Sequence, residues 1–431
     1  MEVNEIIENF ARDKSPGPDG WTMEFFNSFI DLLGNDLVEM VEDTRLTSQV
    51  WGALNATLIT LIPKVQKSGD FTDYRPISLC NLIYKVISKV LSNRIKPILS
   101  RVITPKQFDF LPDRHIIDAI GITQECLHSV KIKKKAACIM KLDLSKVFDR
   151  VNWDLLRYIL LQVGLPYQVT KWVLACVTSA NYAVLVNGSP MDFFQAKHGL
   201  RQGCPLSPLL FLILIEGISR MIYRAKVEGK IKGIPITPDL ILSHLVFVDA
   251  IILFGSSHQA DWEYLRGIFS SFSLASRMLI NFEKSSMLVN ILSDEAIAEV
   301  LAYFPVQVAP IDHGLKYLGY ILIPNCYKAT DWLWLCQKIE KRISSWCNRF
   351  LSFGGRVVLI KTVLCGLHVY WFSLAQVPSC IIDTLRKIIM NLLWQGNAAQ
   401  KKYHLVRWQK ICLPKKMGGW GIKTYFGLMW H

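Results

Sequence analysis

Apolar and polar positions follow two different periods along this chain. From Leu82 to Ile95 the apolar residues recur three or four positions apart and lysines occupy another side, which predicts an amphipathic helix. From His244 to Phe254, two apolar runs rich in β-branched and aromatic residues meet at one carboxylate. This second pattern predicts a tight antiparallel hairpin with Asp249 and Ala250 at the bend.

Asp249 has two interpretations. It is either a turn residue whose side chain caps its own backbone, or a carboxylate that a cation must neutralise because its neighbours are apolar. A second carboxylate favours the cation: Asp143 follows the apolar run from Ala136 to Leu142, which predicts a buried strand. The two aspartates are 106 residues apart, so they converge only if their strands are neighbours in one sheet. Nucleotidyl transfer with two metal ions requires such convergence.

Three motifs carry a family resemblance. They are Lys-Leu-Asp-Leu-Ser-Lys-Val-Phe-Asp (141–149), Gly-Leu-Arg-Gln-Gly-Cys-Pro-Leu-Ser-Pro (199–208) and Phe-Val-Asp-Ala (247–250). In this order they resemble the reverse transcriptases of non-LTR (LINE-type) retrotransposons, the plant lineage especially. The family pattern at the third motif is Phe-Ala-Asp-Asp, whereas this chain has Ala250 in place of the second aspartate.

The resemblance covers nearly the whole chain and implies an α+β, right-hand polymerase fold. Residues 1–135 are then expected to form the fingers, and residues 136–324 the palm with an antiparallel sheet and the catalytic aspartates. Residues 325–431 would form a basic helical thumb with a C-terminal extension. Similar elements usually continue further and carry an endonuclease domain upstream, so a partial or degenerate copy is expected.

The resemblance also implies the site residues. Asp143 and Asp249 are expected to be catalytic and to hold Mg²⁺, with Mn²⁺ as a possible substitute. Phe148 is expected to act as a steric gate against a ribonucleotide's 2′-hydroxyl, although an aromatic residue at this position could simply be core. The residues expected to bind the nucleotide are Lys64, Arg75, Phe148, Arg201, Gln202, Gly203 and Lys284.

Charge is concentrated toward the C-terminus. The net charge is +14, and residues 331–431 hold 15 lysines and arginines against three acidic residues, together with eight of the 13 tryptophans. Basic side chains interleaved with aromatic ones are typical of a nucleic-acid surface, although a charged face is often merely solvated. The residues expected to hold a duplex backbone are Lys341, Arg342, Arg349, Arg356 and Lys361.

The implied reaction is RNA-templated extension of a DNA 3′ end, with an RNA template, a DNA primer and deoxynucleoside triphosphates as partners. Ala250 predicts that this copy polymerises weakly or not at all, because one of three acidic groups is missing. The alternative is a catalytically dead protein that keeps the fold and binds RNA or an RNA–DNA hybrid. A group II intron maturase is disfavoured because the C-terminal block matches the LINE-type thumb.

The remaining composition indicates no other class of protein. The 11 cysteines form no Cys-x-x-Cys pair, so neither a zinc site nor a disulfide framework is indicated, and an intracellular compartment, nucleus or cytoplasm, is expected. The N-terminus is acidic and lacks the apolar core of a signal peptide. No apolar run reaches the roughly 18 residues of a membrane span, so no membrane partner is expected.

Overall fold

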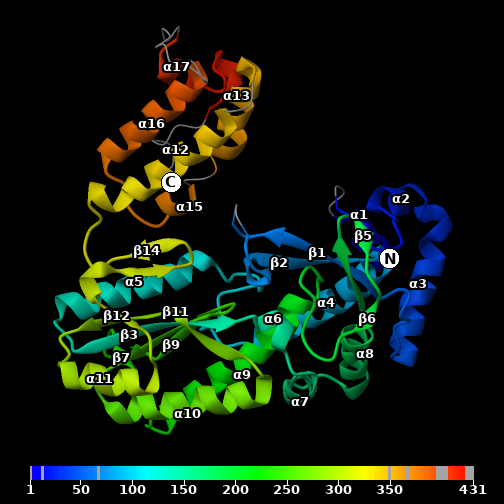
Figure 1. Ribbon diagram of the computed structural model, residues 1–431, viewed down its shortest axis with the longest axis horizontal. Coiled ribbons are helices and arrows are strands. Elements are labelled where there is room, and N and C mark those ends of the chain that lie inside the picture. Colours follow the sequence, from blue (N-terminus) through cyan, green and yellow to red (C-terminus); the bar gives the residue numbers. More distant parts are fainter. Residues whose placement is uncertain are drawn as a thin grey trace. The chain divides into compact units, whose positions relative to one another are not determined.

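The computed structural model describes residues 2–10, 14–65, 68–347, 351–364, 366, 369–394 and 406–422 (Figure 1). The chain divides into two compact units. The first comprises residues 1–119 and 132–310, and the second comprises residues 120–131 and 311–431. The second unit includes residues 311–431 and takes in part of an earlier helix. The assignment of fingers, palm and thumb to particular residues stays a prediction.

The sheet that carries both predicted aspartates lies in the first unit. It has five strands in the order β12 (Gln307–Pro310), β11 (Leu279–Asn290), β3 (Ala137–Ser145), β10 (Ala250–Gly255) and β9 (His244–Phe247). β11 and β12 are parallel, and the other pairs are antiparallel. β3 is the central strand. Six of its nine residues are buried and the other three are half-buried, which explains its apolar run.

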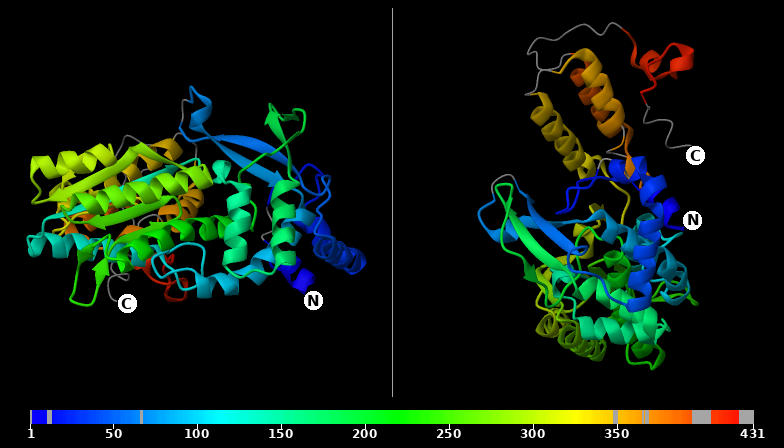
Figure 2. Two further views of the ribbon diagram at one scale, coloured as in Figure 1. Left: turned by 90° about the horizontal axis from the view of Figure 1, so that it is seen from below. Right: turned by 90° about the vertical axis from the view of Figure 1, so that its right-hand side faces the viewer.

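One face of this sheet is covered by helices. α9 (Ser207–Val227) and α10 (Gln259–Ser276) lie side by side, and α11 (Asp294–Tyr303) packs on α10 (Figures 1 and 2). The first half of α9 is apolar on all sides, and every residue from Leu209 to Ile215 is buried. A helix that is apolar all round must be enclosed by other elements, so α9 forms the centre of the unit's core.

A second sheet of the first unit is built on β1 (Ala56–Pro63), which pairs antiparallel with β2 (Tyr74–Cys80) and parallel with β4 (Asn181–Val186). β5 (Ser189–Pro190) and β6 (Phe194–Gln195) both pair with β4. The other elements of this unit are α1 (Glu2–Glu8), α2 (Met23–Ser28), α3 (Ile30–Thr47), α4 (Leu82–Val102), α6 (Val147–Arg150), α7 (Trp153–Gln162), α8 (Tyr167–Thr178), β7 (Ile234–Pro235) and β8 (Ile241–Leu242).

The helix predicted from Leu82 is confirmed as α4 and continues to Val102. The predicted hairpin is also confirmed, but its bend is displaced by one residue. Ala250 already pairs with Phe247 in the ladder, so the two turn residues are Val248 and Asp249. Val248 adopts a positive φ of 51°, which a β-branched residue rarely takes. The pattern failed at the bend because turn preferences place aspartate, not valine, in that conformation.

The second unit is mainly helical. It contains the hairpin β13 (Leu315–Tyr317) and β14 (Tyr320–Leu322), then α12 (Leu333–Cys347), α13 (Phe353–Leu359), α15 (Val369–Phe372), α16 (Ser379–Trp394) and α17 (Trp408–Cys412). α5 (Ile116–Ile132) contributes residues 120–131. Trp332, before α12, is buried against other aromatic rings. Within the described parts of the chain, no helix combines the length and the apolar character needed to traverse a membrane.

Candidate functional site

Sheet pairing brings the two predicted aspartates together. Asp143, in β3, lies directly opposite Ala250, the first residue of β10, and Asp249 immediately precedes Ala250. The backbone N–H of Leu144 donates to the carbonyl oxygen of Asp249 at 3.0 Å. Residues 106 positions apart in the sequence therefore meet at one end of the sheet, as the sequence predicted.

A lysine that the sequence reasoning overlooked is paired with Asp143. Lys141 lies two residues earlier in β3, so its side chain emerges on the same face, and its Nζ donates to Asp143 Oδ2 at 2.8 Å. Both side chains are largely buried, with 16% and 20% of their surface exposed. The ammonium group therefore balances the charge of Asp143.

Asp249 is in a less favourable position. As a residue it is exposed at the turn, but the protein atoms packed around its carboxyl raise the pKa above the ordinary value, and the negative charge of Asp143 raises it further. The nearby charges of Lys141 and Lys284 lower it in part. A divalent cation between the two carboxylates would offset the repulsion that Asp249 meets from Asp143.

β11 completes the third side of this site. Its pairing with β3 is irregular between Asn281 and Ser286, where the block Asn-Phe-Glu-Lys-Ser lies. Asp143 donates its backbone N–H to Ser285 Oγ at 3.1 Å, and that hydroxyl donates to the carbonyl of Asn281 at 2.7 Å. The predicted residue Lys284 lies in this bulge, exposed, and its charge reaches Asp249. The bulge therefore fixes the backbone of Asp143 and brings the ammonium group of Lys284 near Asp249.

Ala250 occupies the position where a third acidic group would belong. It is 4% exposed and lies opposite both Asp143 and Phe247. Residues directly opposite each other in adjacent strands project from the same face of the sheet. A carboxylate at position 250 would therefore stand beside Asp143, whereas the methyl group of Ala250 offers no charge.

The residues present fit a divalent cation only in part. Carboxylate oxygens are the ligands that Mg²⁺ prefers, and Asp143 and Asp249 supply them at one place. Across the described residues, however, there is no group of three or more acidic, histidine or cysteine side chains arranged to hold a metal. The site accordingly provides two carboxylates, with Lys141 paired to one of them.

The loop before α9 lies against the segment that follows Asp143. Leu200 donates its N–H to the carbonyl of Phe148 at 2.6 Å. A side chain at Gly199 would come within 2.8 Å of the Asp149 carbonyl, and its φ is +93°. Glycine is therefore required where the two motifs touch. The ring of Phe148 is half-buried and stacks on Phe211 at 5.1 Å. That contact supports the core interpretation, and the gate role stays a prediction.

A pocket of about 390 Å³ opens along the same loop. Its lining includes Asp149, His198, Arg201 and Gln202, with Tyr182 from β4. Burial raises the pKa of Asp149, while Gln202 and nearby basic groups, Lys146 and others, lower it. Two of the predicted nucleotide residues, Arg201 and Gln202, thus share one pocket. Gly203, next in the chain, has a φ of +103° and lies close to the Ser78 carbonyl.

Arg201 is buried rather than presented to the pocket's opening. It is 5% exposed, its guanidinium lies 4.1 Å from the ring centre of Tyr84, and its Nη2 donates to Asn55 Oδ1 at 2.5 Å. Its Nη1 also lies 3.4 Å from Cys80 Sγ. These contacts indicate that Arg201 anchors the loop to the second sheet. Direct contact between Arg201 and a nucleotide stays a prediction.

The two remaining nucleotide residues belong to the second sheet, and the charge of Lys64 acts on Asp149 in the pocket. Lys64 follows β1, is exposed, and donates from Nζ to the Thr72 carbonyl at 2.7 Å. Arg75 is exposed in β2, opposite Ile62. No contact within the described chain joins either residue to the two aspartates, so their nucleotide-binding roles stay predictions.

The predicted duplex-binding residues belong to the second unit. Lys341 and Arg342 are exposed on α12, and Lys361 is half-buried in a short π-helical turn, Ile360–Leu364. Arg356 differs, because its guanidinium donates to the carbonyls of Leu351 and Leu393 at 3.4 and 3.2 Å and so helps to join α13 to α16. Arg349 lies outside the described residues.

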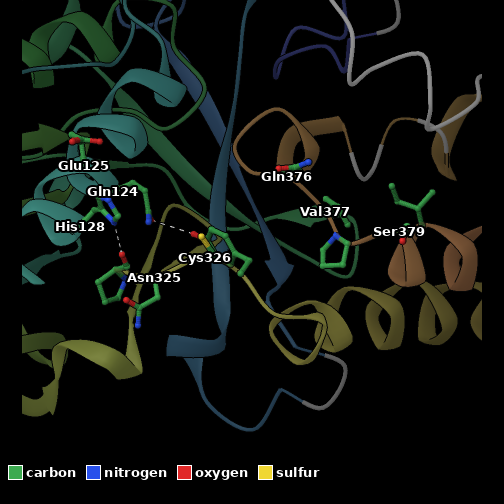
Figure 3. Close-up of a pocket in the computed structure, with 12 residues that line it drawn as sticks. Gln124, Glu125, His128, Asn325, Cys326, Gln376, Val377 and Ser379 are labelled. Carbon is green, nitrogen blue, oxygen red and sulfur yellow. Dashed lines mark hydrogen bonds between the residues drawn. The ribbon is translucent and has the colours of Figure 1, made fainter. Parts of the chain in front are cut away.

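The second unit also contains a pocket that none of these predictions involves. It measures about 720 Å³ and is lined by α5, the segment after β14 and the start of α16 (Figure 3). His128 Nδ1 hydrogen-bonds the Pro324 carbonyl at 2.9 Å, and the Tyr327 hydroxyl donates to Gln124 Oε1 at 3.2 Å. Three of its polar side chains, those of Gln124, His128 and Tyr327, thus join α5 to the segment after β14.

Sequence reasoning missed one further residue beside the hairpin. Asp109 is 4% exposed, and burial raises the pKa of its carboxyl to about 7. The backbone amide of Val248 lowers that pKa, and the charge of Asp249 raises it. The sequence did carry a signal, because Asp109 stands between Phe108 and Phe110. A carboxylate flanked by two aromatic residues is unusual, since acidic side chains are seldom buried.

Comparisons with known proteins agree with this geometry. The family model described as "Reverse transcriptase (RNA-dependent DNA polymerase)" matches residues 62–322. A Xenopus laevis protein, "Transposon TX1 uncharacterized 149 kDa protein", is 26% identical over 98% of this chain and 31% of its own length. The "Retrovirus-related Pol polyprotein from type-2 retrotransposable element R2DM" of Drosophila melanogaster is 23% identical over 95% of this chain and 38% of its own.

The chain thus spans about a third of the length of these curated relatives. Among solved structures, apo telomerase from Candida tropicalis truncated from its C-terminal domain is 16% identical, with a TM-score of 0.40 over 67% of this chain and 61% of that one. The family model covers more than half of the residues, including both aspartates and the loop before α9. The chain therefore belongs to the reverse transcriptase (RNA-dependent DNA polymerase) family.

Proposed function

We propose that this chain is the RNA-directed DNA polymerase region of a LINE-type, non-LTR retroelement of the plant lineage, and that Ala250 impairs its chemistry. The observation that carries the proposal is the convergence of Asp143 and Asp249 at one end of a five-stranded sheet. The substrates are an RNA template, a DNA primer and deoxynucleoside triphosphates.

In this proposal Asp143 and Asp249 would hold Mg²⁺, or Mn²⁺ in its place. Bound there, the cation would draw charge from the attacking and leaving oxygens during nucleotidyl transfer. Lys141, which donates to Asp143 Oδ2, would keep this carboxylate oriented and would share it with a bound cation. Ser285 keeps the Asp143 backbone in place meanwhile.

The neighbouring segments would hold the substrates. Gln202 and Gly203, in the loop before α9, approach the nucleotide and the template base, while Arg201 holds that loop on Tyr84 and Asn55. Phe148 would limit the space at the sugar's 2′ position. Lys64, Arg75 and Lys284 would meet the triphosphate with their charges. Lys341, Arg342, Arg349, Arg356 and Lys361 would hold the duplex.

With alanine at position 250, the site has one carboxylate fewer than the family pattern provides. The Cα of Ala250 pairs directly with that of Asp143, so a carboxylate at position 250 would contribute to cation binding and to stabilising the transition state. Loss of such a group costs on the order of 3 kcal/mol, or about a hundredfold in rate. Alanine at position 250 also favours a second candidate function, that of a non-catalytic protein that binds RNA or an RNA–DNA hybrid.

Primer extension on an RNA template distinguishes these functions. We expect trace extension by the native chain and about a hundredfold more by Ala250→Asp, because the new carboxylate stands beside Asp143. Ala250→Asn is the matched control, since it adds the same bulk without charge, and it should show no gain. Equal extension by the native chain and Ala250→Asp would refute the impairment. Binding of the hybrid without extension by any variant would favour the second candidate.

A further inference from the structure

A buried acidic residue lies along the outer edge of the catalytic hairpin. The segment ending at Asp109 runs beside β9, where a parallel bridge joins Gln107 to Val246. Val246 donates its N–H to the Lys106 carbonyl at 2.9 Å, and Phe108 donates to the Val246 carbonyl at 3.3 Å. Two residues further in the same register, Asp109 is level with Val248 and so lies next to Asp249.

This segment is held firmly in place. Gln107 is fully buried, and its Nε2 donates to Glu216 Oε2 on α9 at 2.8 Å. Lys106 Nζ donates to Ser243 Oγ, just before β9, at 2.9 Å. Anchors to the core helix and to the hairpin's own strand fix the position of Asp109 relative to Asp249.

The carboxyl of Asp109 bonds to the backbone amide of Val248 in the turn of the hairpin, and this contact satisfies only part of it. Asp109 is 4% exposed, and within the described part of the chain its Oδ1 has no hydrogen-bond partner. A buried, unpaired carboxyl oxygen destabilises a fold, and such groups are concentrated at functional sites. The bridge between Gln107 and Val246, with the hydrogen bonds on either side of it, brings this carboxyl beside the turn that carries Asp249.

We propose that Asp109 is a positioning residue of the cation site, whose negative charge acts through space on cations held by Asp143 and Asp249 and compensates in part for Ala250. The inference rests on the proposed function. Asp109 is not a direct ligand in this account, which agrees with the lack of a three-ligand cluster among the described residues. The destabilisation caused by burying the Asp109 carboxyl would be offset by its attraction to a cation bound at Asp143 and Asp249.

Binding of Mn²⁺ to the full chain tests this role, with the free ion measured by electron paramagnetic resonance. We expect Asp109→Asn to weaken binding about tenfold, because one unit of negative charge is removed near a divalent cation. Without metal, its thermal unfolding temperature should equal or exceed that of the native chain. Asp113→Asn is the matched control, since it makes the same change at an exposed position of the following segment, and it should bind Mn²⁺ like the native chain.

The possible outcomes are distinguishable. If Asp109→Asn binds Mn²⁺ as tightly as the native chain, or unfolds at a lower temperature as it loses affinity, the proposed role is wrong. Asp109→Ser repeats the test with a smaller side chain if the first variant does not fold. Asp143→Asn reports on the site itself: it should abolish binding, and unchanged binding there would overturn the proposed function and not merely the role of Asp109.

Discussion

At the scale of single residues, the site is defined by a balance of charge at one end of a sheet. Asp143 has a lysine partner, Asp249 lies exposed at the turn beside that carboxylate, and Asp109 is buried with one carboxyl oxygen unpaired. The sequence could predict that Asp143 and Asp249 converge, because both follow or interrupt apolar runs. It could not predict Lys141 as the partner of Asp143 or Asp109 as a neighbour, since these depend on side-chain direction and on an edge contact between distant segments.

Asp109 gives the fold a pH dependence. Its folded pKa of about 7 lies above the ordinary value of 3.8, so ionisation is harder in the folded state. The resulting destabilisation begins near pH 4, grows as the pH rises, is complete above pH 7, and amounts to roughly 4 kcal/mol at most. Compared with the native chain, Asp109→Asn should therefore be more stable to urea at pH 8 and similar at pH 4.5. A difference between the two chains that is the same at both pH values would contradict this.

At the scale of elements, hydrophobic periodicity predicted the helices and strands better than turn preferences predicted the bend between them. The amphipathic helix α4 and the apolar hairpin are as expected, since burial of one face dictates each pattern. The bend was displaced because Val248 takes a left-handed conformation, held by ladder pairs that the sequence does not reveal. The loop before α9 was recognised from its glycines, but the burial of Arg201 follows from the parallel pairing of β1 with β4, which brings Asn55 and Tyr182 near it.

Arg201 provides a test at this scale. Arg201→Lys keeps the charge but loses the planar stack on Tyr84 and the hydrogen bond to Asn55, so it should lower the free energy of unfolding by about 2 kcal/mol. Urea denaturation measures this effect. Arg75→Lys, at an exposed position, is the control and should change stability little. An undiminished stability of Arg201→Lys, together with weakened nucleotide binding, would show instead that Arg201 contacts the substrate.

At the scale of the whole molecule, the charge is divided unequally between the two compact units. The basic C-terminal quarter lies in the second unit, and the two aspartates lie in the first. The sequence indicated the basic quarter through its composition and the two aspartates through their motifs. It did not indicate that residues 120–131 join the second unit, because that depends on hydrogen bonds such as His128 to Pro324, across nearly 200 positions.

The basic unit should bind nucleic acid by charge. Lys341→Ala should weaken binding of an RNA–DNA hybrid severalfold and reduce the slope of log affinity against log salt by about one, because one phosphate contact is lost. Fluorescence anisotropy at several salt concentrations measures both. Lys171→Ala, a lysine of the first unit whose ammonium lies over Tyr167, is the control and should leave the slope unchanged. Equal effects of the two substitutions would point to a diffuse charge rather than to α12.

In the proposed function, Asp143 and Asp249 act as one cation site. The most direct measurement is the rise in unfolding temperature on adding Mn²⁺, compared among the native chain, Asp143→Asn, Asp249→Asn and the double variant. Ligands that share one cation are not independent, so each single variant should lose nearly the whole rise and the double variant no more. If each single variant keeps about half of the rise and the losses add, or if Mn²⁺ stabilises all four chains equally, the claim is contradicted.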